Sequence, residues 1–274
     1  MCVELTQAAD FASNELQRVF IEEYVESFRT GNLAKYRDSL RNWVKDKAPE
    51  IENIFGFVEP YRDPHGIRAE FEGLVAIADA AETRKLTRLV DNSTQFIRKL
   101  PWTSPENDGK GYNDIRQDTG FKNVIIANRM VAESKAQGYP FIGDHEEAAF
   151  RKAKFPTYYW WVVLHELLGH GTGRMMVENT EGDYNFDIRS PPINPLDGKP
   201  IRSWYKPGQT WTGQFGDLAT TVDECRAELV GAYLMDDKDL LRVLGFTDDT
   251  DVTADDSEWH LAMLGDDRDI DTFA

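Results

Sequence analysis

Cysteine is scarce in this chain, and the 31 basic residues are outnumbered by 48 acidic ones, and each of these features argues against a class of protein. Only Cys2 and Cys225 occur in 274 residues, too few for a disulfide framework in a chain of this length. The formal net charge of −17 disfavours nucleic acid and anionic membranes as partners, because both repel an acidic surface. We therefore expect a partner that is neither nucleic acid nor membrane.

Long apolar runs are also absent. No stretch reaches the roughly eighteen apolar residues of a membrane-spanning helix, and the first residues lack the basic and then apolar pattern of a signal peptide. A Gly-rich phosphate loop, a nucleophile elbow and internal repeats are missing as well. Since 41% of the residues are apolar, the chain can still build a large core, and we expect a cytoplasmic protein.

The most informative stretch places two imidazoles and a carboxylate inside an apolar helix. Pro156 begins an uncharged run that leads to His165, Glu166 and His170 in the sequence His-Glu-Leu-Leu-Gly-His. Zinc-protease helices space their histidines four apart, whereas here the spacing is five, which leaves the side chains roughly 140° apart on a regular helix. Either the site is lost, or the extra residue forms a π-bulge beside Gly169 and marks a different zinc family.

A second helical segment supplies carboxylates that distinguish these alternatives. A hydrolytic zinc site uses three protein ligands and keeps one position open, so two histidines need one carboxylate from elsewhere. Glu224 and Glu228 share a helix face, which allows one to bind metal while the other accepts a ring N–H of a ligand histidine. The same helical spacing directs Asp223 and Arg226 elsewhere.

The two segments together, His-Glu-Leu-Leu-Gly-His and Asp-Glu-Cys-Arg-Ala-Glu, resemble the paired motifs of the dipeptidyl peptidase III family of zinc exopeptidases. The resemblance implies one zinc ion per chain, held by His165, His170 and Glu224, with Glu166 as the general base. Asp223 stands where the family has a glutamate. We place it with Glu228 among the carboxylates that support the ligands.

Residues 56–66 and 70–73 also resemble this family, as does the region around Asn123. The resemblance implies that Glu59 and Glu72 hold the free amino terminus of the substrate, that Tyr61 acts near the scissile bond and that Asn123 binds the peptide. Two carboxylates hold an ammonium group well through charge-assisted hydrogen bonds, and such an anchor limits cleavage to a fixed distance from the chain end.

The expected fold is mainly α-helical with a small β element, similar to the zinc-binding upper lobe of a two-lobed peptidase. Periodicity predicts helices over residues 11–29, 33–43, 68–99 and 144–154, and a strand over 51–59. We expect the catalytic lobe to span residues 1–247, with a deletion near 105–111. Residues 248–274 carry ten acidic residues and one basic residue, which predicts a disordered tail.

The resulting functional hypothesis is a monomeric dipeptidyl peptidase that acts on oligopeptides. Zinc would polarise the scissile carbonyl and lower the pKa of its water, and Glu166 would pass the water's proton to the leaving amine. Two alternatives stay open. A truncated zinc-binding fragment would lack the second lobe and efficient turnover, and an endopeptidase would cut blocked peptides as readily as free ones.

Overall fold

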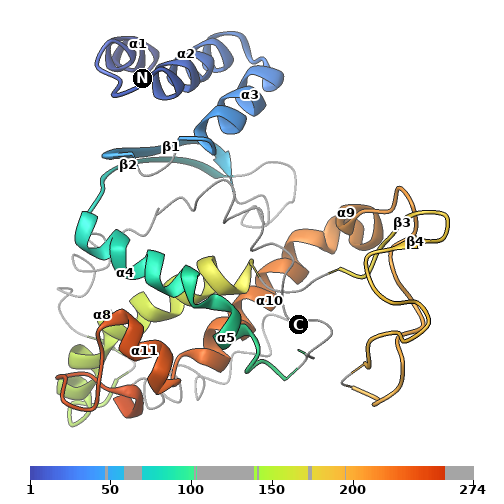
Figure 1. Ribbon diagram of the computed structural model, residues 1–274. Coiled ribbons are helices and arrows are strands. Elements are labelled where there is room, and N and C mark those ends of the chain that lie inside the picture. Colours follow the sequence, from blue (N-terminus) through green and yellow to red (C-terminus); the bar gives the residue numbers. More distant parts are fainter. Residues whose placement is uncertain are drawn as a thin grey trace. The chain divides into compact units, whose positions relative to one another are not determined.

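The structure is a computed structural model that describes residues 1–46, 49–58, 70–101, 103, 139, 140, 142–171, 175–194 and 196–256. Most of the described residues lie in helices, and the strands form two small two-stranded sheets, so the expected mainly helical class is confirmed (Figure 1). The described residues fall into two compact units, the first over residues 1–79 and the second from residue 80 onward.

In the first unit, three helices enclose an aromatic core. They are α1 (Cys2–Ala9), α2 (Glu15–Thr30) and α3 (Leu33–Trp43), the last with the predicted bounds. Helix α2 begins later than predicted because the Asn14 side chain accepts a hydrogen bond from the backbone N–H of Gln17 and so caps the helix. The helix ends at Gly31, whose φ of 73° lies in the left-handed region. Apolar side chains of α1 and α2 bury each other around Phe20 and Tyr24.

The strands β1 (Ile51–Val58) and β2 (Glu70–Ile77) form an antiparallel pair in the same unit. The predicted strand over 51–59 is thereby confirmed, but the predicted long helix over 68–99 is wrong. Its first part is β2, and its later part contains α4 (Ala80–Asp91) and α5 (Ser93–Ile97). Phe71, Val75 and Ile77 lie on one face of β2, because successive side chains of a strand point to opposite faces. The backbone hydrogen bonds that a helix would form within itself are formed here with β1.

In the second unit, α8 (Glu147–Leu164) is one continuous helix that includes Pro156 in its interior. The sequence had suggested that Pro156 begins a new helix, after a separate one over 144–154. The buried residues before and after Pro156 lie on one face of the helix, at spacings of three and four residues. Their packing outweighs the backbone hydrogen bond that proline cannot donate, so the helix continues through Pro156. That face comprises Phe150, Ala153, Thr157, Trp160 and Leu164.

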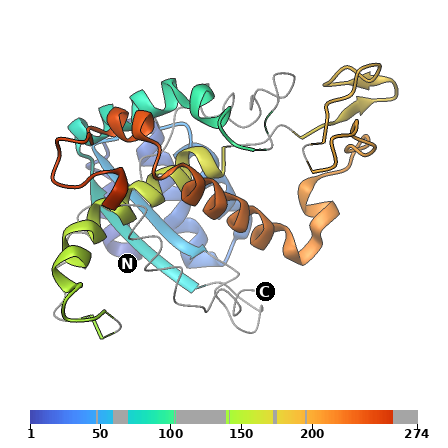
Figure 2. The ribbon, with the colours of Figure 1, turned by 90° about the horizontal axis from the view of Figure 1, so that it is seen from below.

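Helix α10 (Ala219–Leu234) packs against α8, and the two helices lie side by side in Figures 1 and 2. It follows the short helix α9 (Trp211–Phe215) and the 3₁₀ turn η3 (Gly216–Leu218). Helix α11 (Lys238–Leu244) then packs against α4. Among the described residues, no helix combines the length and apolar character needed to cross a bilayer.

Between α8 and α9 the chain makes an excursion that extends away from the helices of its unit in both ribbon views (Figures 1 and 2). It contains the hairpin of β3 (Glu178–Thr180) and β4 (Asp183–Tyr184). Tyr184, Phe186 and Trp204 pack edge to face, with ring centroids 5.5 to 5.7 Å apart, as expected for aromatic anchors. The buried carboxylate of Glu178 accepts hydrogen bonds from Lys206 Nζ at 2.9 Å and from the Gly182 N–H at 3.1 Å.

The acidic carboxyl-terminal stretch begins with packed residues. Val252 and Ala254 are buried, and Asp256 forms an ion pair with Lys152 of α8 at 3.5 Å. The predicted disorder is therefore not seen in residues 248–256, which are packed in the structure. Residues 257–274 lie outside the described part of the chain. The expected deletion near 105–111 also lies outside it.

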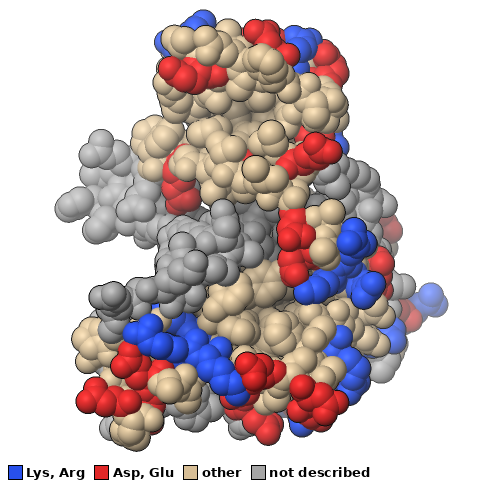
Figure 3. Space-filling view, turned by 90° about the vertical axis from the view of Figure 1, so that its left-hand side faces the viewer, with Lys and Arg blue, Asp and Glu red and all other residues tan. Residues whose placement is uncertain are grey.

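Figure 3 shows one face of the molecule, on which acidic and basic side chains of the described residues are interspersed.

The Glu178 carboxylate makes the excursion sensitive to acid. The hydrogen bond from Lys206, followed by that from Gly182, lowers the pKa of Glu178 to about 2. Because the folded pKa lies below the ordinary value, the ionised form stabilises the excursion at neutral pH, and this stabilisation is lost as the pH falls through about 2. The indole N–H of Trp204 donates to Glu178 at 3.4 Å, so we expect its resonance to titrate there, and Glu178→Gln to remove this step. Glu181→Gln, an exposed neighbour, serves as the control, and an unchanged titration in Glu178→Gln would contradict the assignment.

Candidate metal centre

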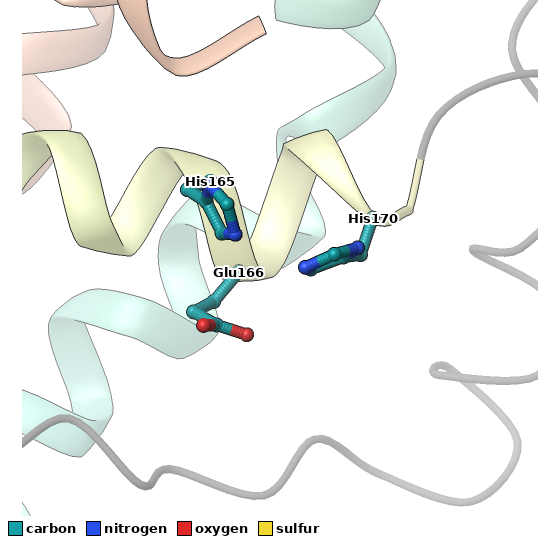
Figure 4. Close-up of side chains that lie close together, drawn as sticks. All are labelled: His165, Glu166 and His170. Carbon is teal, nitrogen blue, oxygen red and sulfur yellow. The ribbon is translucent and has the colours of Figure 1, made fainter. Parts of the chain in front are cut away.

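The segment that carries both histidines is a π-helical turn. Helix α8 continues directly into η2 (His165–Gly169), and the backbone N–H of His170 donates to the carbonyl of His165 at 3.0 Å, which is an i to i+5 bond. Of the two alternatives that the histidine spacing left open, the π-bulge is therefore the one that the structure contains. It brings the imidazole rings to a centroid separation of 4.7 Å. In Figure 4, His165, Glu166 and His170 converge on one side of their helix.

Gly169 has a different role from the one that its sequence position suggested. Its φ is not in the left-handed region, so backbone freedom is not what the position requires. Instead, the backbones of η2 and α10 come so close that a Cβ at Gly169 would lie 2.6 Å from Cα of Ala227. The absence of a side chain at Gly169 therefore sets the distance between the two segments that carry the candidate ligands.

Helix α10 presents Glu224 to both histidines. Its Oε2 lies 3.2 Å from Nε2 of His165 and 3.7 Å from Nε2 of His170. Two ligand atoms about 2.1 Å from a tetrahedral zinc ion are separated by about 3.4 Å. The two observed distances lie on either side of that value, so the Glu224 carboxylate lies within the range at which it could share a metal ion with each imidazole. Two imidazoles with one carboxylate are a donor set that zinc uses.

The outward-facing ring nitrogens meet two further carboxylates. Oδ2 of Asp223 lies 3.1 Å from Nδ1 of His170, and Oε1 of Glu228 lies 3.6 Å from Nδ1 of His165. The expectation that Asp223 and Arg226 point elsewhere is wrong, because Asp223 faces His170 and Arg226 binds Asp223. Asp223 lies one turn before Ala227, the residue that touches Gly169, and this spacing brings it to the same helix face.

Each imidazole has one carboxylate beside its Nδ1 and Glu224 beside its Nε2, as in a metal site where Nδ1 donates a proton and Nε2 binds the ion. A neutral imidazole has one donor and one acceptor nitrogen, so a ring cannot donate to carboxylates on both sides. If Nδ1 of His170 donates to Asp223, its Nε2 presents a lone pair toward Glu224, and a cation between them makes that contact favourable. A cation at the Nε2 atoms is thus one arrangement that satisfies both nitrogens of a neutral ring.

Carboxylates dominate the electrostatics around the two rings. Burial lowers the pKa of His165, but the nearby carboxylate of Glu228, together with those of Glu166 and Glu224, outweighs burial and raises the pKa. Burial raises the pKa of Asp223, but the hydrogen bond and charge of Arg226, together with His170, outweigh burial and lower the pKa, so the carboxylate stays ionised. A negative environment of this kind attracts a cation.

Glu166 belongs to the same cluster. One ligand atom each from His165, Glu166 and His170 lie within 4.8 Å of one another, so Glu166 itself is a possible metal donor. Glu224 Oε2 lies 3.2 and 3.7 Å from Nε2 of His165 and His170, so it approaches each ring through the same nitrogen. Glu166 is also exposed, whereas the rings of His165 and His170 are only 12% and 19% exposed. This arrangement favours Glu224 as the ligand and leaves Glu166 open to a reacting molecule.

The remaining predicted residues lie away from this cluster in the sequence. Glu72 is a half-buried residue of β2 in the first unit, whereas the two histidines belong to the second unit. Glu59, Tyr61 and Asn123 lie outside the described residues. Arg226 was not among the predicted site residues. Its position three residues after Asp223 on a helix was the signal that could have identified it.

Comparisons with known proteins identify relatives of the whole chain. The model of peptidase family M49 matches residues 1–109 and 107–263. Dipeptidyl peptidase 3 of Nematostella vectensis is 39% identical over 88% of this chain and 36% of its own length. The human protein of the same name is 36% identical over 89% of this chain and 37% of its own length. The resemblance seen in the sequence is thereby confirmed.

A solved structure, that of dipeptidyl-peptidase III from Corallococcus sp. strain EGB, has a similar fold. Its TM-score is 0.51 at 19% identity, over 89% of this chain and 48% of the other. The chain thus spans just over a third of the length of the two curated relatives. The two segments of the family match meet at residues 107–109, within the stretch where we expected a deletion, which stays a prediction.

The close approach at Gly169 can be tested by adding one methyl group. In Gly169→Ala the new Cβ would clash with backbone atoms of Ala227, which cannot move aside as a flexible side chain could. We expect a loss of about 1–3 kcal/mol in the free energy of unfolding, measured by urea denaturation, together with weaker metal binding. Gly73→Ala adds the same methyl at 3.4 Å from a Phe55 ring atom and is the control. Unchanged metal affinity in Gly169→Ala would contradict this role for the contact.

Proposed function

This chain belongs to peptidase family M49, and on that basis we propose that it is a zinc-dependent peptidase that releases dipeptides from the amino termini of oligopeptides. The observation that carries the proposal is the approach of one carboxylate oxygen of Glu224 to Nε2 of both His165 and His170. Three such ligands leave one coordination position open, as hydrolytic zinc sites require.

In the proposed site, His165, His170 and Glu224 hold one zinc ion per chain. Glu228 and Asp223 accept the Nδ1 protons of the two rings, which fixes each imidazole with its Nε2 lone pair directed inward. When bound, zinc supplies a Lewis acid that polarises a carbonyl and acidifies water.

Glu166 is the proposed general base. It directly follows His165, and the position of its carboxylate beside the two rings, on the side to which they converge, supports this role (Figure 4). Its exposed carboxylate takes a proton from the attacking water and returns it to the leaving amine nitrogen of the cleaved peptide bond. A carboxylate suits proton uptake from water and proton delivery to the amine, because the same group acts as base in its ionised form and as acid once it is protonated.

The proposed substrate is an oligopeptide with a free amino terminus. The names of the relatives, dipeptidyl peptidase 3, support release of dipeptides. We propose Glu59 and Glu72 as the groups that bind the ammonium, with Asn123 on the peptide backbone and Tyr61 beside the scissile bond. Two carboxylates would bind one positive charge, which selects free over blocked amino termini. We propose a cytoplasmic monomer.

A second candidate is a zinc-binding chain without efficient peptidase activity. One observation favours it, namely that the chain spans only 36% and 37% of the length of the two relatives. Misplacement of positioning groups alone can remove large rate factors, so metal binding and turnover need separate measurements. An endopeptidase, the third possibility, would not distinguish free from blocked peptides.

The decisive experiment measures dipeptide release from a dipeptidyl arylamide and zinc content in the same samples. We expect release that a chelator abolishes and zinc restores, and we expect no cleavage of the amino-acetylated substrate. Glu166→Gln should lower kcat by about 10²- to 10⁴-fold with zinc content unchanged, because it removes the base and keeps the ligands. Glu147→Gln, in the first turn of the same α8, is the control and should keep wild-type kcat.

Each other outcome identifies a different alternative. Stoichiometric zinc without chelator-sensitive release would support the metal-binding chain and refute the peptidase. Equal cleavage of free and acetylated substrates would support an endopeptidase. Failure to bind zinc at all would refute the metal site itself.

A further inference from the structure

We propose that Arg226 is a positioning residue for the metal centre, because it holds the Asp223 carboxylate against His170. The inference rests on the proposed function, since His170 has to be a metal ligand for its orientation to affect the site. Arg226 contacts Asp223, and Asp223 contacts His170, so Arg226 acts on the ring through Asp223.

The geometry that supports this role is a chain of three side chains. Nη2 of Arg226 lies 2.5 Å from Oδ1 of Asp223, and Oδ2 of the same carboxylate lies 3.1 Å from Nδ1 of His170. Each carboxylate oxygen thus has its own partner. Because the guanidinium occupies one oxygen, rotation of the carboxylate is restricted and the other oxygen stays directed at the ring.

The short side chain of Asp223 reaches His170 in few orientations. An aspartate has one methylene between backbone and carboxylate, so its Oδ2 meets the ring only in a narrow range of χ1 and χ2, which the contact with Arg226 maintains. Arg226 lies three residues later on α10, where its side chain can reach back to Asp223 along the helix surface. Both side chains are partly shielded, with 36% of Asp223 and 26% of Arg226 exposed, so solvent weakens their contact less than it weakens a fully exposed pair.

The other histidine provides an internal comparison. Glu228 faces Nδ1 of His165 at 3.6 Å, and its side chain is 52% exposed. No Lys or Arg ion pair to Glu228 occurs within the described part of the chain. The two supporting carboxylates therefore differ, since the one at His170 is restrained by a guanidinium and makes the shorter contact.

The test is a double-mutant cycle on zinc affinity, measured by competition with a chromophoric chelator. Removal of a carboxylate that supports a ligand histidine weakens metal binding by about 10- to 100-fold. We expect Asp223→Asn to fall in this range and Arg226→Met to weaken binding by about tenfold. The double variant should be no weaker than Asp223→Asn alone, because Arg226 acts only through Asp223.

Glu228→Gln supplies the matched control cycle. Its effect acts through His165, so the losses from Arg226→Met and Glu228→Gln should multiply. Arg226→Lys keeps the charge and loses the planar guanidinium, and we expect it to recover only part of the affinity. Independent multiplication of the Arg226→Met and Asp223→Asn losses, or unchanged affinity in Arg226→Met, would overturn the proposal. If Arg226→Met does not fold, Arg226→Lys and Arg226→Gln complete the same cycle.

A measurement without metal separates this inference from the proposed function. In metal-free protein, the ¹⁵N shifts of the His170 ring should change in Arg226→Met and stay unchanged in Glu228→Gln. If the wild type fails to bind zinc while the His170 shifts still respond, the proposed function fails and the contact chain stands. If zinc binds and neither affinity nor shifts respond to Arg226→Met, the positioning role fails and the metal site stands.

Discussion

The candidate metal centre depends on the backbone contact between Gly169 and Ala227. Two helical segments that carry side chains at this point would lie further apart, because a Cβ at Gly169 would be 2.6 Å from Cα of Ala227. A second close approach occurs at the other end of the same face, where a Cβ at Gly231 would lie 2.6 Å from a ring atom of Trp161. Ala227 and Gly231 are one turn apart, so these small residues let α10 lie directly against α8 and η2.

The same face of α10 supplies the chemistry. Glu224, Ala227, Glu228 and Gly231 follow the spacing of three and four that defines one side of a helix, so the residues that permit close packing alternate with those that approach the histidines. A side chain of fixed length can reach both imidazoles only if the helix axes are close. Packing and metal geometry are therefore one constraint, and a change in either one alters the other.

Sequence reasoning succeeded where local chemistry determines structure. The five-residue histidine spacing predicted the π-turn, and the Leu33–Trp43 helix has the expected bounds. Sequence reasoning failed where contacts between residues far apart in the sequence determine the secondary structure. Glu70–Ile77 becomes a strand because it pairs with Ile51–Val58, and Pro156 stays inside a helix because residues on both sides of it are buried. Helical spacing alone directed Asp223 away from the histidines, because it ignores the width of the face that α10 presents, whereas the family resemblance placed Asp223 among the supporting carboxylates.

The carboxylates around the two histidines give the site an electrostatic reason to hold a cation. Asp223, Glu224 and Glu228 approach the rings at 3.1 to 3.7 Å, while Arg226 is the cation paired with Asp223. Like charges gathered at a partly buried point repel one another, and they favour unfolding unless a positive charge joins them. In the proposed site, a divalent cation at the Nε2 atoms would remove that repulsion, so metal binding and the packing of α10 on η2 would stabilise each other. The Gly169 contact that brings the carboxylates together would then also raise the affinity for the ion.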